Sequence, residues 1–126
     1  GGLMPGADSV CFENTEELFT DENEAYCVYE NEIATPGLIT PLYACTKNNH
    51  FAKLLIDGLT NKEEVGEPWL TTGNLYMMET IEKNSPARVK ILPSYIFNPV
   101  HKSGIRYQGN AKVYDKQKWG TTFNLY

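Results

Sequence analysis

A lone acidic residue on a glycine-rich turn is the first group in the sequence that could do chemistry. Asp8 follows "GGLMPGA" and stands just before Val10-Cys11-Phe12, whose side chains are typical of a short buried strand. A carboxylate beside such a strand is well placed to hold a hard cation, because its oxygen atoms suit Mg²⁺ or Mn²⁺. An Asp on a turn also commonly hydrogen-bonds its own backbone, and both roles stay open for Asp8.

The segment Thr71-Thr72-Gly73-Asn74 is a second candidate, because it is expected to begin a helix. Free backbone N–H groups at a helix start can bind anions or sugar hydroxyls. The alternative is that Thr72 or Asn74 only caps the helix.

The two histidines are expected to be structural. His50 stands at the start of an expected helix, and His101 follows Pro99 and Val100 in an expected loop. The sequence contains no GxSxG, HExxH, P-loop or GxGxxG motif, so it shows no sign of the enzyme classes that those motifs mark.

Short strands and two helices are expected to position these groups. The strands are predicted at residues 10–12, 25–29, 38–40, 89–92 and 95–97, with Glu30, Asn31 and Glu32 just beyond the end of the second. The first helix is predicted to run from an Asn48 or Asn49 cap to Asn61. The second is predicted from 71–74 to 84–86, after an extended link at 67–70, with a buried face of Leu75, Met78 and Ile81.

These elements predict one domain over residues 1–126, of the α/β or α+β class, with a mixed sheet and a few helices. The C-terminal segment contains Gly104, Gly109 and Gly120 but is unusually aromatic for a disordered end. We therefore expect it to pack back on the body of the domain.

The composition narrows the function classes. The 126 residues are 41% hydrophobic, which argues against disorder, and the net charge of −5 argues against general nucleic-acid binding. Three cysteines without CxxC spacing indicate neither a disulfide framework nor a zinc site, and they favour a reducing compartment such as the cytoplasm. No apolar run reaches the ~20 residues of a membrane span.

The order of these features resembles the C-terminal half of glycosyltransferases with a GT-A fold and a DXD sugar-binding region. That group is related to initiating mannosyltransferases of fungi and to capsular and viral sugar transferases. Gly1-Gly2-Leu3 matches the start of a motif similar to "GG(I/L)Y-x-D-x-D", and Asp8 falls on its second Asp. Thr72-Gly73-Asn74 falls on a "TGP" segment and Trp119 on the tryptophan of the family's tail segment. The resemblance covers nearly the whole chain.

The resemblance implies a partial GT-A-like nucleotide-diphospho-sugar transferase fold, from which the N-terminal nucleotide-binding half is missing. The implied parent activity is transfer of a hexose from a nucleotide sugar to a glycan or lipid acceptor. Asp8 would be the metal ligand, for Mn²⁺ or Mg²⁺, and the metal would hold the diphosphate. The implied substrate-binding residues are Glu30, Asn31, Thr72, Gly73 and Asn74, with Trp119 closing the cleft on the sugar.

The sequence also departs from the family pattern. Gly6 stands in place of the first motif Asp, Gln117 in place of the tail His, and Asn74 in place of the "TGP" proline. We therefore expect weak metal binding and no turnover by this chain alone.

Two other interpretations stay open. One is a non-catalytic carbohydrate-binding or protein-interaction module on the same scaffold, and the other is a small α+β domain of unrelated function. A half-fold would also leave a sheet edge and a helix face exposed, which predicts a homo-oligomer or a swapped assembly.

Overall fold

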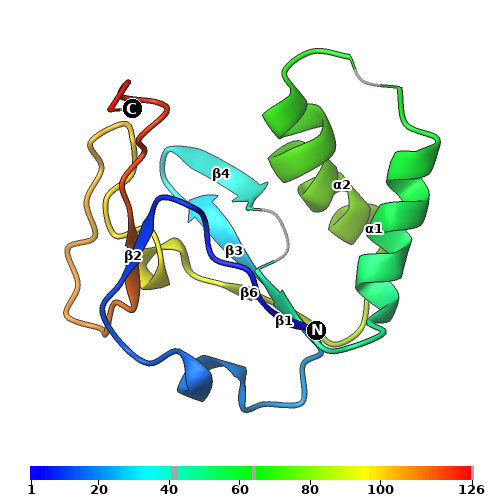
Figure 1. Cartoon of the computed structure of the whole chain (residues 1–126), viewed down its shortest axis with the longest axis horizontal. Helices are drawn as coiled ribbons and strands as arrows, with labels where there is room; N and C mark the ends of the chain where they lie inside the picture. Colours follow the sequence, from blue (N-terminus) through cyan, green and yellow to red (C-terminus); the bar gives the residue numbers. More distant parts are fainter. Residues whose placement is uncertain (41–42, 64, 126) are drawn as a thin grey trace.

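The computed structural model describes residues 1–40, 43–63 and 65–125. It is a mixed α/β structure in which two helices lie on one side of a mixed sheet and the C-terminal segment lies on the other (Figure 1). The prediction of a mixed sheet with a few helices is confirmed.

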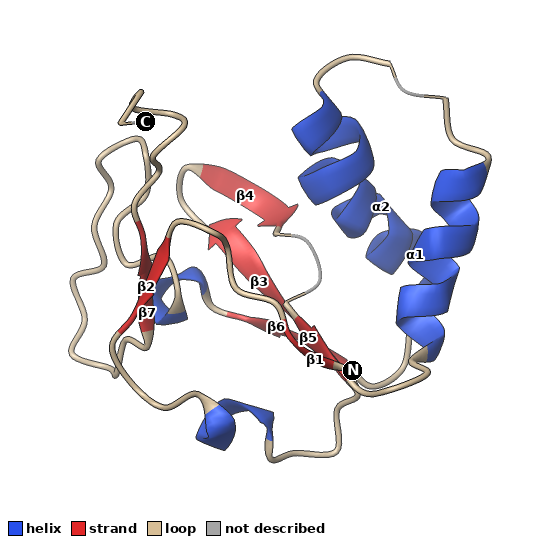
Figure 2. Ribbon diagram, in the orientation of Figure 1, coloured by secondary structure: helices blue, strands red, loops and turns tan. Residues whose placement is uncertain are grey.

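The central strand of the sheet is β3 (Ala25–Asn31). It pairs in parallel with β6 (Val89–Leu92) and antiparallel with β4 (Thr35–Ile39) and β5 (Ala44–Cys45), and β1 (Gly2–Leu3) continues the sheet beyond β5 (Figure 2). β3 is almost entirely buried, and its first five residues form a continuous run without polar alternation, followed by the buried polar residues Glu30 and Asn31.

Successive side chains of β3 enter two different cores, because side chains alternate across a strand. Ala25 and Cys27 pack with the residues of the two helices. Tyr26 and Val28 pack on the other face, in a second core that also contains Ala44, Leu92, Ile96, Phe97 and Tyr114. β3 therefore joins the helical side of the molecule to the tail side.

The helix α1 (His50–Thr60) confirms its prediction at both ends. The Asn49 side chain caps it by accepting a hydrogen bond from the Ala52 N–H, at 2.9 Å from N to Oδ1, and Asn61 follows its last residue.

The second helix, α2 (Leu75–Asn84), begins differently from the prediction. The expected extended link at 67–70 is wrong, because the chain is already helical from Pro68 and continues through a π-helical segment, Trp69–Asn74. Proline fits the first helical turn, since its φ is fixed there and the missing N–H would have no partner. Thr72 and Asn74 consequently make no side-chain cap.

The buried face of α2 is also shifted from the predicted one. Met78 and Ile81 pack only at the edge of the helical core, whereas the buried residues of the helix are Tyr76, Met77 and Thr80. The Tyr76 hydroxyl donates to the Leu55 carbonyl at 2.8 Å, so α2 turns this side toward α1.

The strand predicted at 95–97 is wrong as well, since Ser94–Ile96 is a 3₁₀ turn. The Ser94 N–H and hydroxyl both donate to the Glu32 carboxylate, at 2.9 and 2.5 Å, and the Phe97 and Asn98 N–H groups bond back to the Ser94 carbonyl. This local network folds the chain into a turn where the residue types favour a strand.

The strands predicted at 10–12 and 38–40 overlap β2 (Ser9–Cys11) and β4, whereas β1, β5 and β7 (Asp115–Gln117) were not predicted. A 3₁₀ turn spans Glu16–Phe19, and β2 pairs antiparallel with β7. Tyr114 is buried in the second core, so the expectation that the tail packs back is confirmed. Within the ranges that the structure describes, no helix is long and apolar enough to cross a membrane.

Candidate functional site

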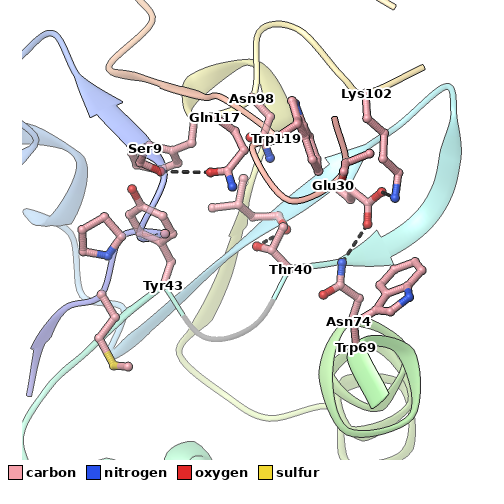
Figure 3. Close-up of a pocket in the computed structure, with 16 residues that line it drawn as sticks. Ser9, Glu30, Thr40, Tyr43, Trp69, Asn74, Asn98, Lys102, Gln117 and Trp119 are labelled. Atoms are coloured by element: carbon pink, nitrogen blue, oxygen red, sulfur yellow. Dashed lines mark hydrogen bonds and ion pairs between the residues drawn. The ribbon is translucent and has the colours of Figure 1, made fainter. Parts of the chain in front are cut away.

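A cleft of about 560 Å³ lies where the sheet, the π-helical segment and the tail meet (Figure 3). Its volume is within the range of small-molecule sites. The lining residues come from the whole length of the chain: Met4, Pro5, Gly6, Ser9, Val28, Glu30, Thr40, Tyr43, Trp69, Asn74, Phe97, Asn98, Lys102, Gln117, Trp119 and Thr122.

One end of the cleft is built around the carboxylate of Glu30, which is only 3% exposed. Asn74 Nδ2 donates to Oε2 at 2.7 Å, and His101 Nε2 lies 3.0 Å from Oε1. Lys102 Nζ lies 3.8 Å from the same Oε1. A buried carboxylate is tolerated only where such partners replace water, and here they come from positions 44 and 71 residues away along the chain.

The hydrogen bonds around His101 assign its tautomer. The Ser103 backbone N–H donates to Nδ1, at 3.2 Å, so Nδ1 is an acceptor and carries no proton. The proton of the neutral ring is then on Nε2, from which it is donated to Glu30. His101 therefore orients the Glu30 carboxylate without adding a charge.

A tight turn presents His101 and Lys102 to Glu30. Val100 and Arg106 form an isolated β-bridge, and the His101 N–H donates to the Ile105 carbonyl at 2.9 Å. Gly104 has a φ of +90°, a conformation that glycine adopts without strain. The turn thus holds both side chains on the same side of a short loop.

Two tryptophans form walls at this end. Trp119 has a left-handed backbone, with a φ of +57°, which is rare for a bulky residue and costs energy. Its Nε1–H donates to the Val100 carbonyl at 2.9 Å, and its ring meets the His101 ring edge-on at 5.4 Å. Trp69 is 46% exposed. The Lys102 ammonium lies over both indole rings, at 4.7 Å from the Trp69 centroid and 5.7 Å from that of Trp119.

The other end of the cleft is lined by uncharged polar groups. Ser9 donates to Gln117 Oε1 at 3.0 Å, and Gln117 Nε2 donates in turn to Asp8 Oδ1. The second oxygen of Asp8 accepts the Gly120 N–H at 3.0 Å. Asp8 is itself not among the lining residues, so its carboxylate faces the tail instead of the cleft.

The surroundings of Asp8 do not fit a Mn²⁺ or Mg²⁺ ion. Both of its oxygens already accept hydrogen bonds, and the neighbouring side chain is an amide. Within residues 1–40, 43–63 and 65–125, no three His, Cys, Asp or Glu side chains come together as metal ligands. A Cβ at Gly6 would lie 3.0 Å from Gln117 Oε1, so the position of the first motif Asp lies beside the position of the tail His. Metal binding at Asp8 stays a prediction that none of these contacts supports.

Tyr43 lines the cleft at its Ser9 end, close to a buried acid (Figure 3). Burial raises the pKa of the Tyr43 hydroxyl, and the nearby Asp115 carboxylate raises it further. Asp115 is 3% exposed, and its Oδ1 has no hydrogen-bond partner among the described residues. Burial also raises the pKa of Asp115.

The structure brings three of the six predicted substrate-binding residues into the cleft, namely Glu30, Asn74 and Trp119. The sequence had placed Glu30 just beyond the end of the strand, but in the structure Glu30 lies inside β3.

The other three do not line the cleft. Asn31 Oδ1 accepts from the backbone N–H groups of Ile33 and Ala34, at 3.0 and 2.8 Å, and so shapes the turn into β4. The Thr72 hydroxyl donates to the Pro68 carbonyl at 2.9 Å, and Gly73 forms the kink between the π-helical segment and α2.

Sequence reasoning missed three residues of the site: Trp69, His101 and Lys102. The Pro68-Trp69 pair could have been read as a helix start, because proline favours the first turn. The segment Pro99–Gly104 has the composition of a tight turn, which could have marked His101 and Lys102 as presented side chains.

The arrangement can recognise a small polar molecule that also has an apolar face. Glu30, Asn74 and Gln117 offer oxygens and amide groups to hydroxyls, and the two indoles offer flat apolar surfaces. Comparisons with family models, with curated proteins and with solved structures found no match to this chain.

Proposed function

We propose that the cleft binds a hexose and that the chain is a glycosyltransferase-like domain. Its parent activity is the transfer of a hexose from a nucleotide sugar to a hydroxyl of a glycan or lipid acceptor. The proposal rests on the resemblance to DXD-containing GT-A glycosyltransferases together with the geometry of the cleft. The homo-oligomer stays a prediction.

One observation carries the proposal: Glu30, Asn74 and Trp119 converge on one cleft although they are far apart in the sequence. Asn74 and Trp119 lie in the segments of the resemblance, and Glu30 lies on the central strand β3. A hexose has equatorial hydroxyls on its rim and C–H groups on its faces. Carboxylate and amide groups hydrogen-bond the first, and an indole face packs on the second.

The residues of this chain have defined tasks in that proposal. Glu30 accepts hydrogen bonds from sugar hydroxyls, since a carboxylate has capacity for more than the two short bonds that Asn74 and His101 supply. His101 keeps the carboxylate oriented through Nε2–H. Trp119 and Trp69 exclude water from the sugar and fix the plane of its ring.

The alternative, a non-catalytic carbohydrate-binding module, is favoured by the Asp8 contacts. Both Asp8 oxygens accept hydrogen bonds from the tail, which is the arrangement of a structural carboxylate. In this alternative the same cleft binds a glycan without turnover.

Calorimetric titration with methyl glucoside, UDP-glucose and GDP-mannose tests both candidates, with Mn²⁺ and with EDTA. We expect Trp119→Ala to weaken binding by about tenfold or more, because the stacking surface is lost. Phe123→Ala is the matched control, since Phe123 is an aromatic residue of the same tail that is 51% exposed and does not line the cleft.

Release of nucleoside diphosphate, followed in the same samples, separates the two candidates. Turnover supports the transferase, and glycan binding in EDTA without turnover supports the module. The absence of binding to any of these ligands would contradict both.

A further inference from the structure

We propose that Lys102 binds the diphosphate of the nucleotide-sugar donor and supplies, without a metal ion, the positive charge that this group needs. The inference rests on the proposed function, because it concerns the donor in the same cleft.

Lys102 lies at the cleft, and its contact with Glu30 is the longest of the three that the carboxylate makes. Glu30 is satisfied by Asn74 and His101 at 2.7 and 3.0 Å, whereas Lys102 Nζ stands 3.8 Å away. Nζ donates no hydrogen bond to any residue within the described ranges. Its three N–H groups are therefore free to bind an anion beside Glu30, while Asn74 and His101 keep the carboxylate hydrogen-bonded.

The two tryptophans hold the ammonium group in position. It lies 4.7 Å from the Trp69 centroid and 5.7 Å from the Trp119 centroid, where the ring faces attract a cation. The Lys102 side chain is 32% exposed on a flexible four-carbon stem, so the group can reach into the cleft while its stem stays on the indoles.

The charge balance of the cleft gives Lys102 its role. Among the lining residues that the structure describes, Glu30 and Lys102 are the charged ones, and the rest are uncharged. A diphosphate brings several negative charges into this space, and a charge removed from water needs a counter-charge. Lys102 is the cation that the lining offers.

The Asp8 end of the cleft leads to the same conclusion. Where the DXD pattern implies a metal, the structure places the Gln117 amide against Asp8, with Gly6 beside it. That end presents uncharged Ser9 and Gln117 to a ligand. The positive charge that balances the diphosphate must then come from Lys102, at the other end of the cleft.

Titration of UDP and inorganic pyrophosphate in EDTA tests the inference with Lys102→Met, which keeps an unbranched apolar stem and removes the charged end. We expect both affinities to fall about tenfold, and Lys102→Arg to restore most of the loss. The affinity of the native protein should also weaken as salt is raised. Lys118→Met is the matched control, because Lys118 is an exposed lysine of the tail that does not line the cleft.

Methyl glucoside, which has no phosphate, separates this inference from the proposed function. If the glucoside binds while pyrophosphate and UDP bind equally well to Lys102→Met and the native protein, the inference is overturned and the saccharide site stands. Diphosphate binding that requires Mn²⁺ and ignores Lys102 overturns it too. Loss of diphosphate binding in a Lys102→Met protein that keeps the native melting temperature supports it.

Discussion

The two ends of the cleft each have an acidic residue beside them, and the two residues have opposite surroundings. Glu30 is buried, yet its carboxylate lines the cleft, held by neutral donors and one lysine. Asp8 lies on a turn near the surface, yet its carboxylate faces away and is taken up by the tail. Burial alone therefore does not tell which acid can meet a ligand; the direction of the carboxylate and the identity of its partners do.

The difference follows from what each carboxylate joins. Asp8 links the N-terminal turn to residues 109 and 112 positions further on, and so fastens β2 and β7 at their ends. Glu30 instead collects one side chain from the helical side and two from the loop after Asn98, all of them at the edge of the cleft. The Asp8 contacts fasten two segments of the chain, whereas the Glu30 contacts hold a carboxylate in place at the wall of the cleft.

The largest effect on stability is expected from Glu30→Ala, which breaks the more buried of the two networks. It leaves the His101 and Asn74 donors unpaired, and we expect it to lower the free energy of unfolding by about 3 kcal/mol. Glu30→Gln keeps the shape and one acceptor oxygen, and should cost about half as much. Urea denaturation monitored by circular dichroism measures both. A loss below about 1 kcal/mol for Glu30→Ala would show that water replaces the carboxylate, and that the network does not hold the site.

Several of the strands and helices that carry these hydrogen-bond networks can be predicted from the sequence. β6 and α1 follow local signals, namely the alternation at 89–92 and the Asn49 cap before an apolar helical face. β3 was foreseen at 25–29 but extends two residues further, because its register with β4 reaches Asn31. That extension moves Glu30 from a loop to a rigid strand.

The rest depends on contacts that no local pattern contains. The turn at 94–96 is set by the Glu32 carboxylate, 62 residues away from Ser94. The partners of Glu30 come together only once the Val100–Arg106 turn packs beside β3, so His101 looked like an isolated histidine. Asp8 was predicted as a ligand from its residue type, and the direction of its carboxylate is fixed by a tail more than a hundred residues away.

Asp8→Ala is expected to have the next largest effect, at about 1 to 2 kcal/mol of unfolding free energy, because two hydrogen bonds between the N-terminal turn and the tail are lost. Asp8→Asn is the informative companion. Gln117 can reverse its amide and Ser9 can accept as well as donate, so these contacts can be rebuilt at a cost within about 0.5 kcal/mol. Chemical denaturation at pH 7 ranks the two variants. A structural carboxylate predicts that neither changes the affinity for methyl glucoside by more than about twofold; a larger change would assign Asp8 to the site after all.

The smallest effect is expected from Asp115→Asn, and its sign is opposite to that of the others. Burial holds the pKa of Asp115 above its ordinary value of 3.8, so the folded protein favours the protonated acid more than the unfolded chain does. The stability that this group contributes is therefore full below pH 3.8 and is lost as the pH rises through the raised native value. At pH 7 the ionised acid destabilises the folded state, and Asp115→Asn should raise the free energy of unfolding by less than about 1 kcal/mol.

The gain should vanish as the pH is lowered toward 4, and the difference between the native and variant stability curves isolates it from the other carboxyl groups. Glu82→Gln, at an exposed acid of α2, should give a difference that hardly varies over the same range. A difference for Asp115→Asn that stays flat or grows toward acid pH would mean that the unpartnered Oδ1 is satisfied in solution, and that the tail, like the Asp8 turn, contains only stabilising carboxylates.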